Sequence, residues 1–278
     1  MDRREFNRWL GVAASVPWLA NHASAMSQDR GGNLTAGDPH SNQEKPAGDP
    51  VRIGMLLYPG MYALDLVGPH AILAGIPGVE TYLLWKGLQA IPTHYGMNLV
   101  PTLTLANCPK KLDVLFVPGG TPGTIAMMQD NEVLDFLADR GKSARYVTSV
   151  CTGSLILGAA GLLQGYRATS HWHKRDLLPL FGAIPQESRI VEDRNRITGG
   201  GVTSGIDFGL VLASRLFGDD EAKVQQLVNE YDPHPPFSAG TPAQAGQVIT
   251  ARANQILAQG YEQTRVVALA ARKRLGLS

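Results

Sequence analysis

The sequence is poor in cysteine and in net charge, and each shortage excludes a class of protein. Its 278 residues contain only two cysteines, Cys108 and Cys151, too few for the disulfide framework of a small secreted domain. A single bridge between them stays open, because it depends on a Cα separation that the sequence does not give. The 25 basic and 24 acidic residues leave a formal net charge of +1 and no basic tract. Nothing therefore indicates a nucleic-acid or membrane-surface partner.

Long apolar runs and metal-ligand spacings are also lacking. The apolar stretch from Trp9 to Ala20 is only about a dozen residues, too short to span a bilayer. Among the seven histidines, His171 and His173 could share one strand face, but no third ligand follows at a suitable spacing. We therefore expect no membrane span and no metal site.

The first 25 residues have the features of an export signal. Arg3 and Arg4 precede Phe6 and the apolar stretch, and Ala23-Ser24-Ala25 then offers the small-x-small pattern of a cleavage site. The pattern predicts a twin-arginine-type signal peptide over residues 1–25 and hence a periplasmic protein. An N-terminal amphipathic helix is the alternative.

Strands and helices alternate from Val51 onward. Near-continuous apolar runs, VRIGMLLYP at 51–59 and LDVLFVPGG at 112–120, are typical of strands buried on both faces of a sheet. The alternation predicts a three-layer α/β domain over residues 51–237 with a doubly wound, mostly parallel sheet. The segments on either side are predicted to be a disordered linker over 26–50 and a helical C-terminal extension over 238–278.

Three shorter elements are expected inside the domain. Residues 98–106 look like a hairpin-like insertion, 168–172 like a short strand, and 189–201 like a hairpin with its turn near Asp193 to Asn195. In doubly wound sheets, ligand sites form outside the carboxyl ends of the strands. Three predicted strands end in candidate site residues, so we expect the functional site at that edge of the sheet.

Cys151 stands where a buried strand gives way to a helix, in YVTSVCTGSLILGAAGLL at 146–163. The small Ser149 and Gly153 on either side permit the tight turn of a nucleophile elbow. A thiol at a helix start is favoured as thiolate, and its pKa of about 8.5 can fall to roughly 3.5–7.5 in such sites. A buried structural thiol is the alternative, but the small neighbours of Cys151 and the helix that follows it favour a nucleophile.

A nucleophile needs an anion cradle, and backbone amides at two strand ends are candidates. The amide of Thr152 opens the helix after Cys151, and those of Gly119 and Gly120 end a neighbouring strand. We expect the two glycines to bind an oxyanion or the substrate. A simple tight turn is the alternative for this glycine pair.

Asp65 is the candidate proton donor. Its apolar neighbours Leu64 and Leu66 predict partial desolvation, which raises the pKa of a carboxyl and suits it to share a proton. A helix N-cap is the ordinary role for such an aspartate. His171 as a base for Cys151 is the less favoured possibility.

These motifs together resemble the ThiJ/PfpI family, in the order YPGMYALDLVGP, LDVLFVPGG, RYVTSVCTGSLILGAAGLL, ATSHW and ITGGGVTSGIDFGL. The resemblance implies a flavodoxin-like fold of the class I glutamine amidotransferase type. It also implies a homodimer that acts on a small-molecule substrate without metal or organic cofactor. The family nucleophile maps to Cys151, its partner carboxylate to Asp65 and its neighbouring hydroxyl to Thr152.

Within the family, the aspartate of LDLVGP, the Cys-Thr pair and the later LLQG and HW resemble the branch that hydrates isonitriles to N-substituted formamides. Thr152 stands where the proteolytic branch has histidine, and Asp65 where the glyoxalase branch has glutamate. Two alternatives stay open. One is a glyoxalase-like or amidase-like cysteine hydrolase of small carbonyl compounds. The other is a redox-sensing stress protein, because exposed low-pKa thiolates oxidise readily.

Overall fold

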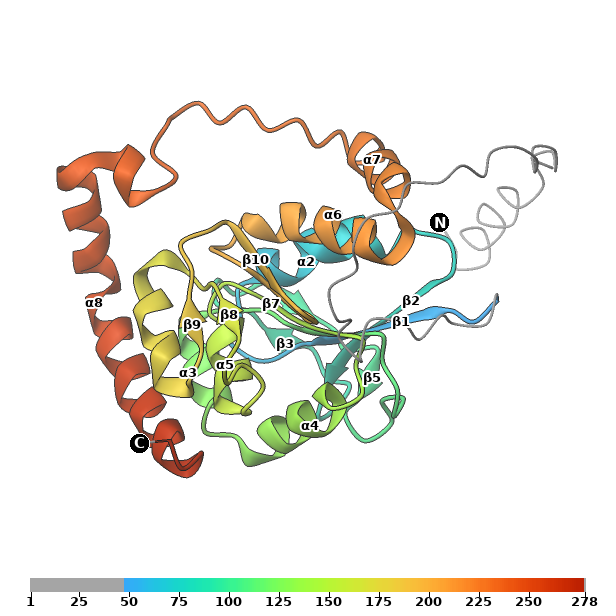
Figure 1. Ribbon diagram of the computed structural model, residues 1–278, viewed down its shortest axis with the longest axis horizontal. Helices are drawn as coiled ribbons and strands as arrows, with labels where there is room; N and C mark the ends of the chain where they lie inside the picture. The colour runs from blue at the N-terminus through green and yellow to red at the C-terminus, as the bar shows by residue number, and fades with distance from the viewer. Residues whose placement is uncertain (1–47, 278) are drawn as a thin grey trace, which may run out of the picture. The chain divides into compact units, whose positions relative to one another are not determined.

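The computed structural model describes residues 48–277, in which a seven-stranded sheet forms the centre (Figure 1). Its strand order is β10-β11-β7-β6-β1-β2-β5, and every neighbouring pair is parallel except β10 with β11. The strands are β1 (Val51–Leu56), β2 (Val79–Trp85), β5 (Leu103–Thr104), β6 (Val114–Val117), β7 (Tyr146–Val150), β10 (Ile190–Asp193) and β11 (Arg196–Gly199).

Helices cover both faces of this sheet. In Figure 1, α2 and α6 lie on one side, and α3, α4 and α5 lie on the other. The helices are α2 (Ala63–Leu73), α3 (Thr121–Met127), α4 (Asn131–Gly141), α5 (Gly153–Ala159), the 3₁₀ helix η1 (Trp172–Phe181), α6 (Ser204–Phe217), α7 (Asp219–Val228) and α8 (Pro242–Arg274).

The inner strands run β2-β1-β6-β7-β11, which is the 2-1-3-4-5 order of flavodoxin-like sheets. The predicted fold class is therefore confirmed. Strand β6 is buried along its whole length, as is α5, so the continuous apolar runs lie where both faces are covered. The carboxyl ends of β1, β6 and β7 meet at one edge, and the candidate residues follow them.

Two of the shorter predictions need correction. The 98–106 segment does not fold back on itself: β4 (Asn98–Leu99) pairs antiparallel with β3 (Ile91–Pro92), and β5 joins the edge of the main sheet. The expected strand at 168–172 ends early, because β8 (Arg167–Ala168), paired with β9 (Ile184–Pro185), gives way to η1 at Trp172.

A local capping interaction explains the second difference. The Nδ1 atom of His171 accepts a hydrogen bond from the backbone N–H of His173, which starts the helix where alternation favoured a strand. The 189–201 hairpin is confirmed, with Arg194 in its turn at a φ of 53°. The predicted signal peptide and residues 26–47 of the predicted linker lie outside the described residues.

The long helix α8 bends at Gly246, where φ is 74°, and its later part packs on η1, α3 and α5 (Figure 1). Its contact face is narrow and consists of small buried side chains, with Thr264, Ala268 and Ala271 at its centre. Arg274 secures the end by donating to the carbonyl of Ala159 at 2.8 Å. The C-terminal segment thus covers the part of the domain that follows the Cys151 helix.

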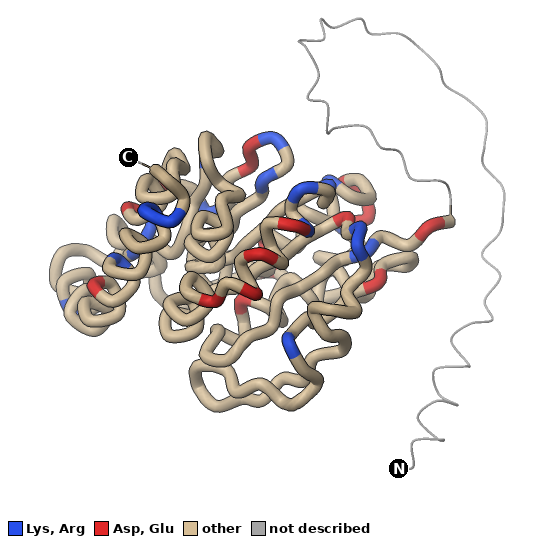
Figure 2. The backbone as a smooth tube through the Cα atoms, turned by 90° about the horizontal axis from the view of Figure 1, so that it is seen from below, with Lys and Arg blue, Asp and Glu red and all other residues tan. Residues whose placement is uncertain are grey.

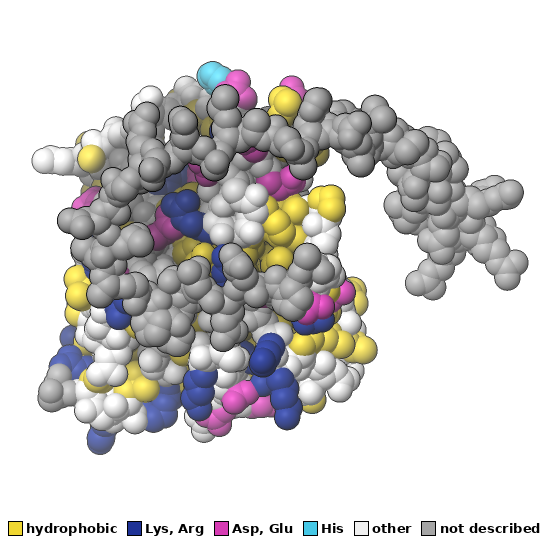
Figure 3. Space-filling model, turned by 45° about the vertical axis from the view of Figure 1, so that its right-hand side comes forward, with side chains coloured by type: hydrophobic (Ala, Val, Ile, Leu, Met, Phe, Trp, Pro, Cys, Tyr) yellow, Lys and Arg dark blue, Asp and Glu magenta, His cyan; other side chains and the backbone are white. Residues whose placement is uncertain are grey.

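Charged residues on the described surface occur in mixed groups. Figure 2 shows basic and acidic positions close together along the backbone, and Figure 3 shows hydrophobic side chains lying among polar and charged ones on one face. Arg215, for example, pairs with Glu192 at 2.7 Å and ties α6 to β10. Such exposed pairs contribute little to stability individually. No helix between residues 48 and 277 has the length and apolar character needed to cross a membrane.

Candidate active site

Cys151 occupies a strained turn between β7 and α5. Its φ is 58°, in the left-handed region that a non-glycine residue rarely adopts, at a cost of about 1–3 kcal/mol. The turn is held by hydrogen bonds on both sides: its N–H donates to the carbonyl of Gly200 at 2.7 Å, and its carbonyl accepts from Ser170 Oγ at 3.1 Å. This backbone is that of a nucleophile elbow.

Gly153 shows why the turn needs small neighbours. A Cβ atom at this position would lie 2.1 Å from the carbonyl oxygen of Val117, at the end of β6. Helix α5 therefore starts directly against the neighbouring strand. That close approach brings the Cys151 turn beside the Pro118 to Gly120 loop.

Asp65 reaches the same place from the first turn of α2. The N-cap of that helix is Tyr62, so Asp65 does not cap it. The side chain is fully buried, and Oδ2 accepts a hydrogen bond from the N–H of Gly119 at 2.8 Å. Burial raises the pKa of this carboxyl to about 7, against the opposing effects of Gly119 and the Cys151 thiol. The predicted desolvation of Asp65 is present in the structure.

The thiol of Cys151 is also almost completely buried, with 3% of its surface exposed. Burial raises its pKa well above the usual value, and the charge of Asp65 raises it further, while hydrogen bonds from the backbone and side chain of Thr152 lower it. The expected depression of the thiol pKa is thus wrong, because burial and the carboxylate outweigh the helix start. Cys151 and Asp65 instead form a buried pair in which each group shifts the pKa of the other.

The glycine loop has a different task from the predicted one. The N–H of Gly119 donates to Asp65, and that of Gly120 donates to Thr152 Oγ1 at 2.9 Å, so neither amide is free for an oxyanion. A Cβ on Gly119 would lie 2.5 Å from the Thr152 nitrogen and 2.9 Å from Asp65 Oδ2. The loop therefore positions the carboxyl and the hydroxyl, and the backbone of Thr152 is the donor that remains next to the sulfur.

Three site residues carried no usable sequence signal. Thr124 of α3 lies with its hydroxyl 2.7 Å from that of Thr152. Lys174 of η1 is buried, and its charge interacts with that of Cys151. Tyr62 lies over the glycine loop, where its N–H donates to the Gly119 carbonyl at 2.9 Å. Only the folded topology brings these residues close to Cys151.

His171 is a poor candidate for the base. Burial, with the nearby charges of His173 and Lys174, lowers its pKa to about 4. Its Nδ1 atom already accepts the capping hydrogen bond from His173. The ring is therefore neutral near pH 7 and serves the start of η1.

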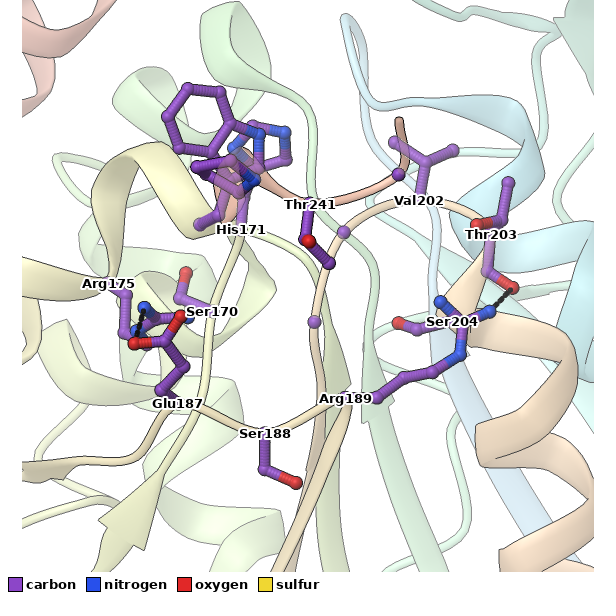
Figure 4. A pocket seen from close by; sticks show the side chains of 15 residues that line it. Ser170, His171, Arg175, Glu187, Ser188, Arg189, Val202, Thr203, Ser204 and Thr241 are labelled. Carbon is purple, nitrogen blue, oxygen red and sulfur yellow. Dashed lines mark hydrogen bonds and ion pairs between the residues drawn. The ribbon is translucent and has the colours of Figure 1, made fainter. Parts of the chain in front are cut away.

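A cavity of about 380 Å³ lies beside the Cys151 backbone (Figure 4). Ser170 and Gly200, two of the residues that hydrogen-bond the main chain of Cys151, line it. Arg175 paired with Glu187 borders it from one direction, and Thr241, from the segment just before α8, reaches over it. On this side, the path from solvent to the Cys151 turn is therefore bordered by η1, the 200–204 loop and the C-terminal segment.

Both cysteines are free and buried in this structure. Within the part of the chain that the structure describes, no three His, Cys, Asp or Glu side chains gather closely enough to hold a metal ion. The chemistry that the described site offers is that of a thiol, a carboxyl with a raised pKa and a cradle of hydroxyl and amide donors.

Residues 51–215 match the DJ-1/PfpI family. The chain belongs to this family. A curated DJ-1/PfpI relative, isonitrile hydratase from Pseudomonas putida, is 49% identical over 224 residues, which cover 80% of this chain and 97% of the relative.

Solved DJ-1/PfpI structures agree with the fold. A ThiJ/PfpI family protein from Pseudomonas syringae is 48% identical, with a TM-score of 0.78 over 85% of this chain and 97% of that chain. Drosophila melanogaster DJ-1beta, at 21% identity and a TM-score of 0.59, covers 66% of this chain and all of its own. At that identity the second match supports the fold alone.

Proposed function

We propose that the protein hydrates isonitriles to N-substituted formamides, with Cys151 as nucleophile and Asp65 as proton donor. The observation that carries the proposal is the buried pair of a strained elbow cysteine and a carboxyl whose pKa is about 7. The 49% identity to an isonitrile hydratase, across 97% of that relative, supports isonitriles as the substrate class of this pair.

The first step forms a carbon–sulfur bond. The terminal carbon of R–NC accepts the electron pair of the Cys151 thiolate, and the proton held by Asp65 is transferred to that carbon. The product is a thioimidate, R–N=CH–S–Cys151. Covalent catalysis of this kind divides one difficult addition into two easier ones.

The second step restores the starting pair of thiolate and protonated Asp65. The oxygen of water adds to the thioimidate carbon, the second proton of that water passes to the imine nitrogen, and the carbon–sulfur bond breaks to release R–NH–CHO and the Cys151 thiolate. The Asp65 carboxylate left by the first step is the base that accepts a proton from the water. One water molecule is consumed in total, and nothing is oxidised or reduced.

Burial of the thiol favours a slender substrate. With only 3% of Cys151 exposed, a reagent must present its reactive atom at a narrow tip. An isonitrile does so, because its reactive carbon ends a linear group. A planar carbonyl compound is bulkier at the reacting atom, which weighs against the glyoxalase-like or amidase-like alternative.

The redox-sensor alternative loses its main support. A sensor cysteine is expected to be exposed and to have a low thiol pKa. Burial raises the pKa of both Cys108 and Cys151. Mild peroxide treatment that modified Cys151 without any turnover of small substrates would restore this alternative.

The deciding experiment is formamide detection with a simple alkyl isonitrile. We expect the full chain to give the N-alkylformamide, seen by its formyl proton in NMR spectra, and to incorporate oxygen from labelled water. Cys151→Ala should abolish the product, whereas Cys108→Ala should retain it. Wild-type protein that leaves isonitriles unchanged would overturn the proposal.

Homodimerisation and export complete the proposal. The family resemblance supports a dimer, which light scattering of the purified chain will test. The paired arginines at positions 3 and 4 support twin-arginine export. Fractionation of cells producing the chain, compared with Arg3→Lys/Arg4→Lys, should show periplasmic protein only for the unaltered sequence.

A further inference from the structure

Lys174 is a buried cation that the reaction described above does not use. Its side chain is 2% exposed, and its Nζ atom is fully buried with no hydrogen-bond partner among the described residues. An ammonium group removed from water without such a partner costs several kcal/mol. A buried cation without a partner is expected at a functional site, where a gain in activity offsets its cost in stability.

Both the backbone and the ammonium group of Lys174 lie next to segments that hold the Cys151 turn. At the backbone end, the Lys174 N–H donates to the carbonyl of His171 at 2.9 Å, directly after Ser170, whose hydroxyl donates to the Cys151 carbonyl. A displacement of η1 would therefore also displace the backbone of the Cys151 turn.

The ammonium end lies between α8 and the start of α3. A Cβ atom built on Gly260 would be 3.6 Å from Nζ and 2.9 Å from Cγ2 of Thr121. Thr121 directly follows Gly120, whose N–H donates to Thr152. Gly260 thus lets α8 close over the ammonium and exclude water from it.

The sulfur of Cys151 is the partner toward which this charge acts. Burial lowers the pKa of Lys174 to about 8, and the charges that oppose this are first that of Cys151 and then that of Asp176. The group is therefore still mostly protonated at pH 7. Asp176 is exposed and accepts the hydroxyl of Tyr261, so the Cys151 sulfur is the buried group that would carry the opposing charge once its thiol loses a proton.

The other titratable groups around Lys174 do not supply a second buried anion. On η1, His171 and His173 have lowered pKa values, mainly through burial, and are neutral at pH 7. Helix α8 brings Tyr261 and the surface pair of Glu262 with Arg265. Helices α3 and α5 and strand β9 carry no titratable side chain.

We propose that Lys174 is a positioning residue, whose buried ammonium favours the form of the Asp65–Cys151 pair with the proton on Asp65 and the negative charge on sulfur. The inference deepens the proposed function and rests on Cys151 being its nucleophile. That form is the one the first step needs, because it provides a thiolate and an acid together. Lys174 acts through the sulfur and need not touch the substrate.

The test compares wild type with Lys174→Met, a variant of similar length that removes the charge. Alkylation of Cys151 by iodoacetamide, followed on its peptide by mass spectrometry, should be about tenfold slower at pH 7, which corresponds to a rise of about one unit in thiol pKa. The ultraviolet absorbance of the thiolate, corrected with Cys151→Ala, should titrate at correspondingly higher pH.

Matched variants separate charge from structure. Lys174→Arg keeps the charge and should stay closer to wild type than Lys174→Met does, while Lys110→Met, at an exposed lysine, should equal wild type. If Lys174→Met does not fold, Lys174→Gln takes its place. Wild-type alkylation rates and titration in the folded neutral variant would overturn the inference.

The readout is independent of isonitrile turnover. A wild-type chain that alkylates rapidly but forms no formamide would refute the proposed function and leave the role of Lys174 standing. Unchanged alkylation in Lys174→Met, with formamide still produced by the wild type, would refute the lysine alone.

Discussion

The carboxyl of Asp65 faces the thiol of Cys151, and both groups are almost completely buried. Each shifts the pKa of the other: the thiol lowers that of the carboxyl, and the carboxylate raises that of the thiol. The Oδ1 atom of Asp65 has no hydrogen-bond partner among the described residues, so this oxygen is available to carry a proton.

Asp65→Asn should abolish turnover but make the fold more stable above pH 7. The pKa of Asp65 is about 7 in the folded chain and close to 3.9 when unfolded, so the folded state binds the proton more tightly. Wild-type stability should therefore fall as pH rises from about 4 to 7, by up to about 4 kcal/mol. Urea unfolding at pH 4 and pH 8 will measure this difference.

The asparagine variant lacks this titration, so its advantage should be present at pH 8 and absent at pH 4. Asp135→Asn, at an exposed aspartate of α4, is the control and should show no such difference. An advantage of the Asp65 variant that is the same at both pH values would contradict the buried, raised-pKa carboxyl.

Thr152→Val should slow the thiolate chemistry through the hydroxyl alone. Thr152 Oγ1 accepts from the Gly120 N–H and pairs with the hydroxyl of Thr124, and the Thr152 side chain lowers the Cys151 thiol pKa. Removing the hydroxyl leaves two buried donors without partners, at a cost of about 1–3 kcal/mol. It should also raise the thiol pKa, which alkylation rates across pH will report.

Thr152→Ser keeps the hydroxyl and is the matched comparison. It should retain most of the alkylation rate at pH 7, because both donors keep their acceptor. Equal rates for the valine and serine variants would show that the side-chain hydrogen bond does not reach the sulfur.

Gly153→Ala should be strongly destabilising. The new Cβ would meet the Val117 carbonyl oxygen at 2.1 Å, so either β6 or the start of α5 must move. We expect a loss of about 3 kcal/mol or more in the free energy of unfolding. Gly75→Ala, where the nearest atom lies 3.6 Å away, should change it by no more than about 0.5 kcal/mol. Equal stability of the two variants would contradict the close strand–helix contact.

The sequence was a good guide to the sheet edge and to the strained turn that carries Cys151. Buried strands appear as continuous apolar runs, and the small residues around Cys151 are required by local backbone geometry, so both signals are contained in adjacent residues. The desolvation of Asp65 was predicted from its flanking leucines, of which only Leu66 is buried in the fold while Leu64 is exposed.

Contacts between distant segments could not be predicted. The amides of Gly119 and Gly120 were expected to face substrate, but Asp65 and Thr152 occupy them, and that pairing depends on how α2 and α5 dock against β6. Lys174 lies in the charged run from His173 to Asp176, and only the packing of η1 against α8 buries it. The raised thiol pKa likewise depends on the total burial of the site, which no local pattern records.

Lys174→Met should stabilise the fold at pH 7 even while it weakens the nucleophile. The pKa of Lys174 is about 8 when folded and close to 10.4 when unfolded, so the unfolded chain binds the proton more tightly and wild-type stability should rise between about pH 8 and 10.5. Methionine fills a similar volume without the charge. The variant should therefore gain about 1–3 kcal/mol at pH 7 and lose most of that gain near pH 10. Urea unfolding at the two pH values, with Lys110→Met as the exposed comparison, measures this effect. A methionine variant no more stable than wild type at pH 7 would mean that the ammonium already has a compensating partner, and the cost attributed to its burial would be absent.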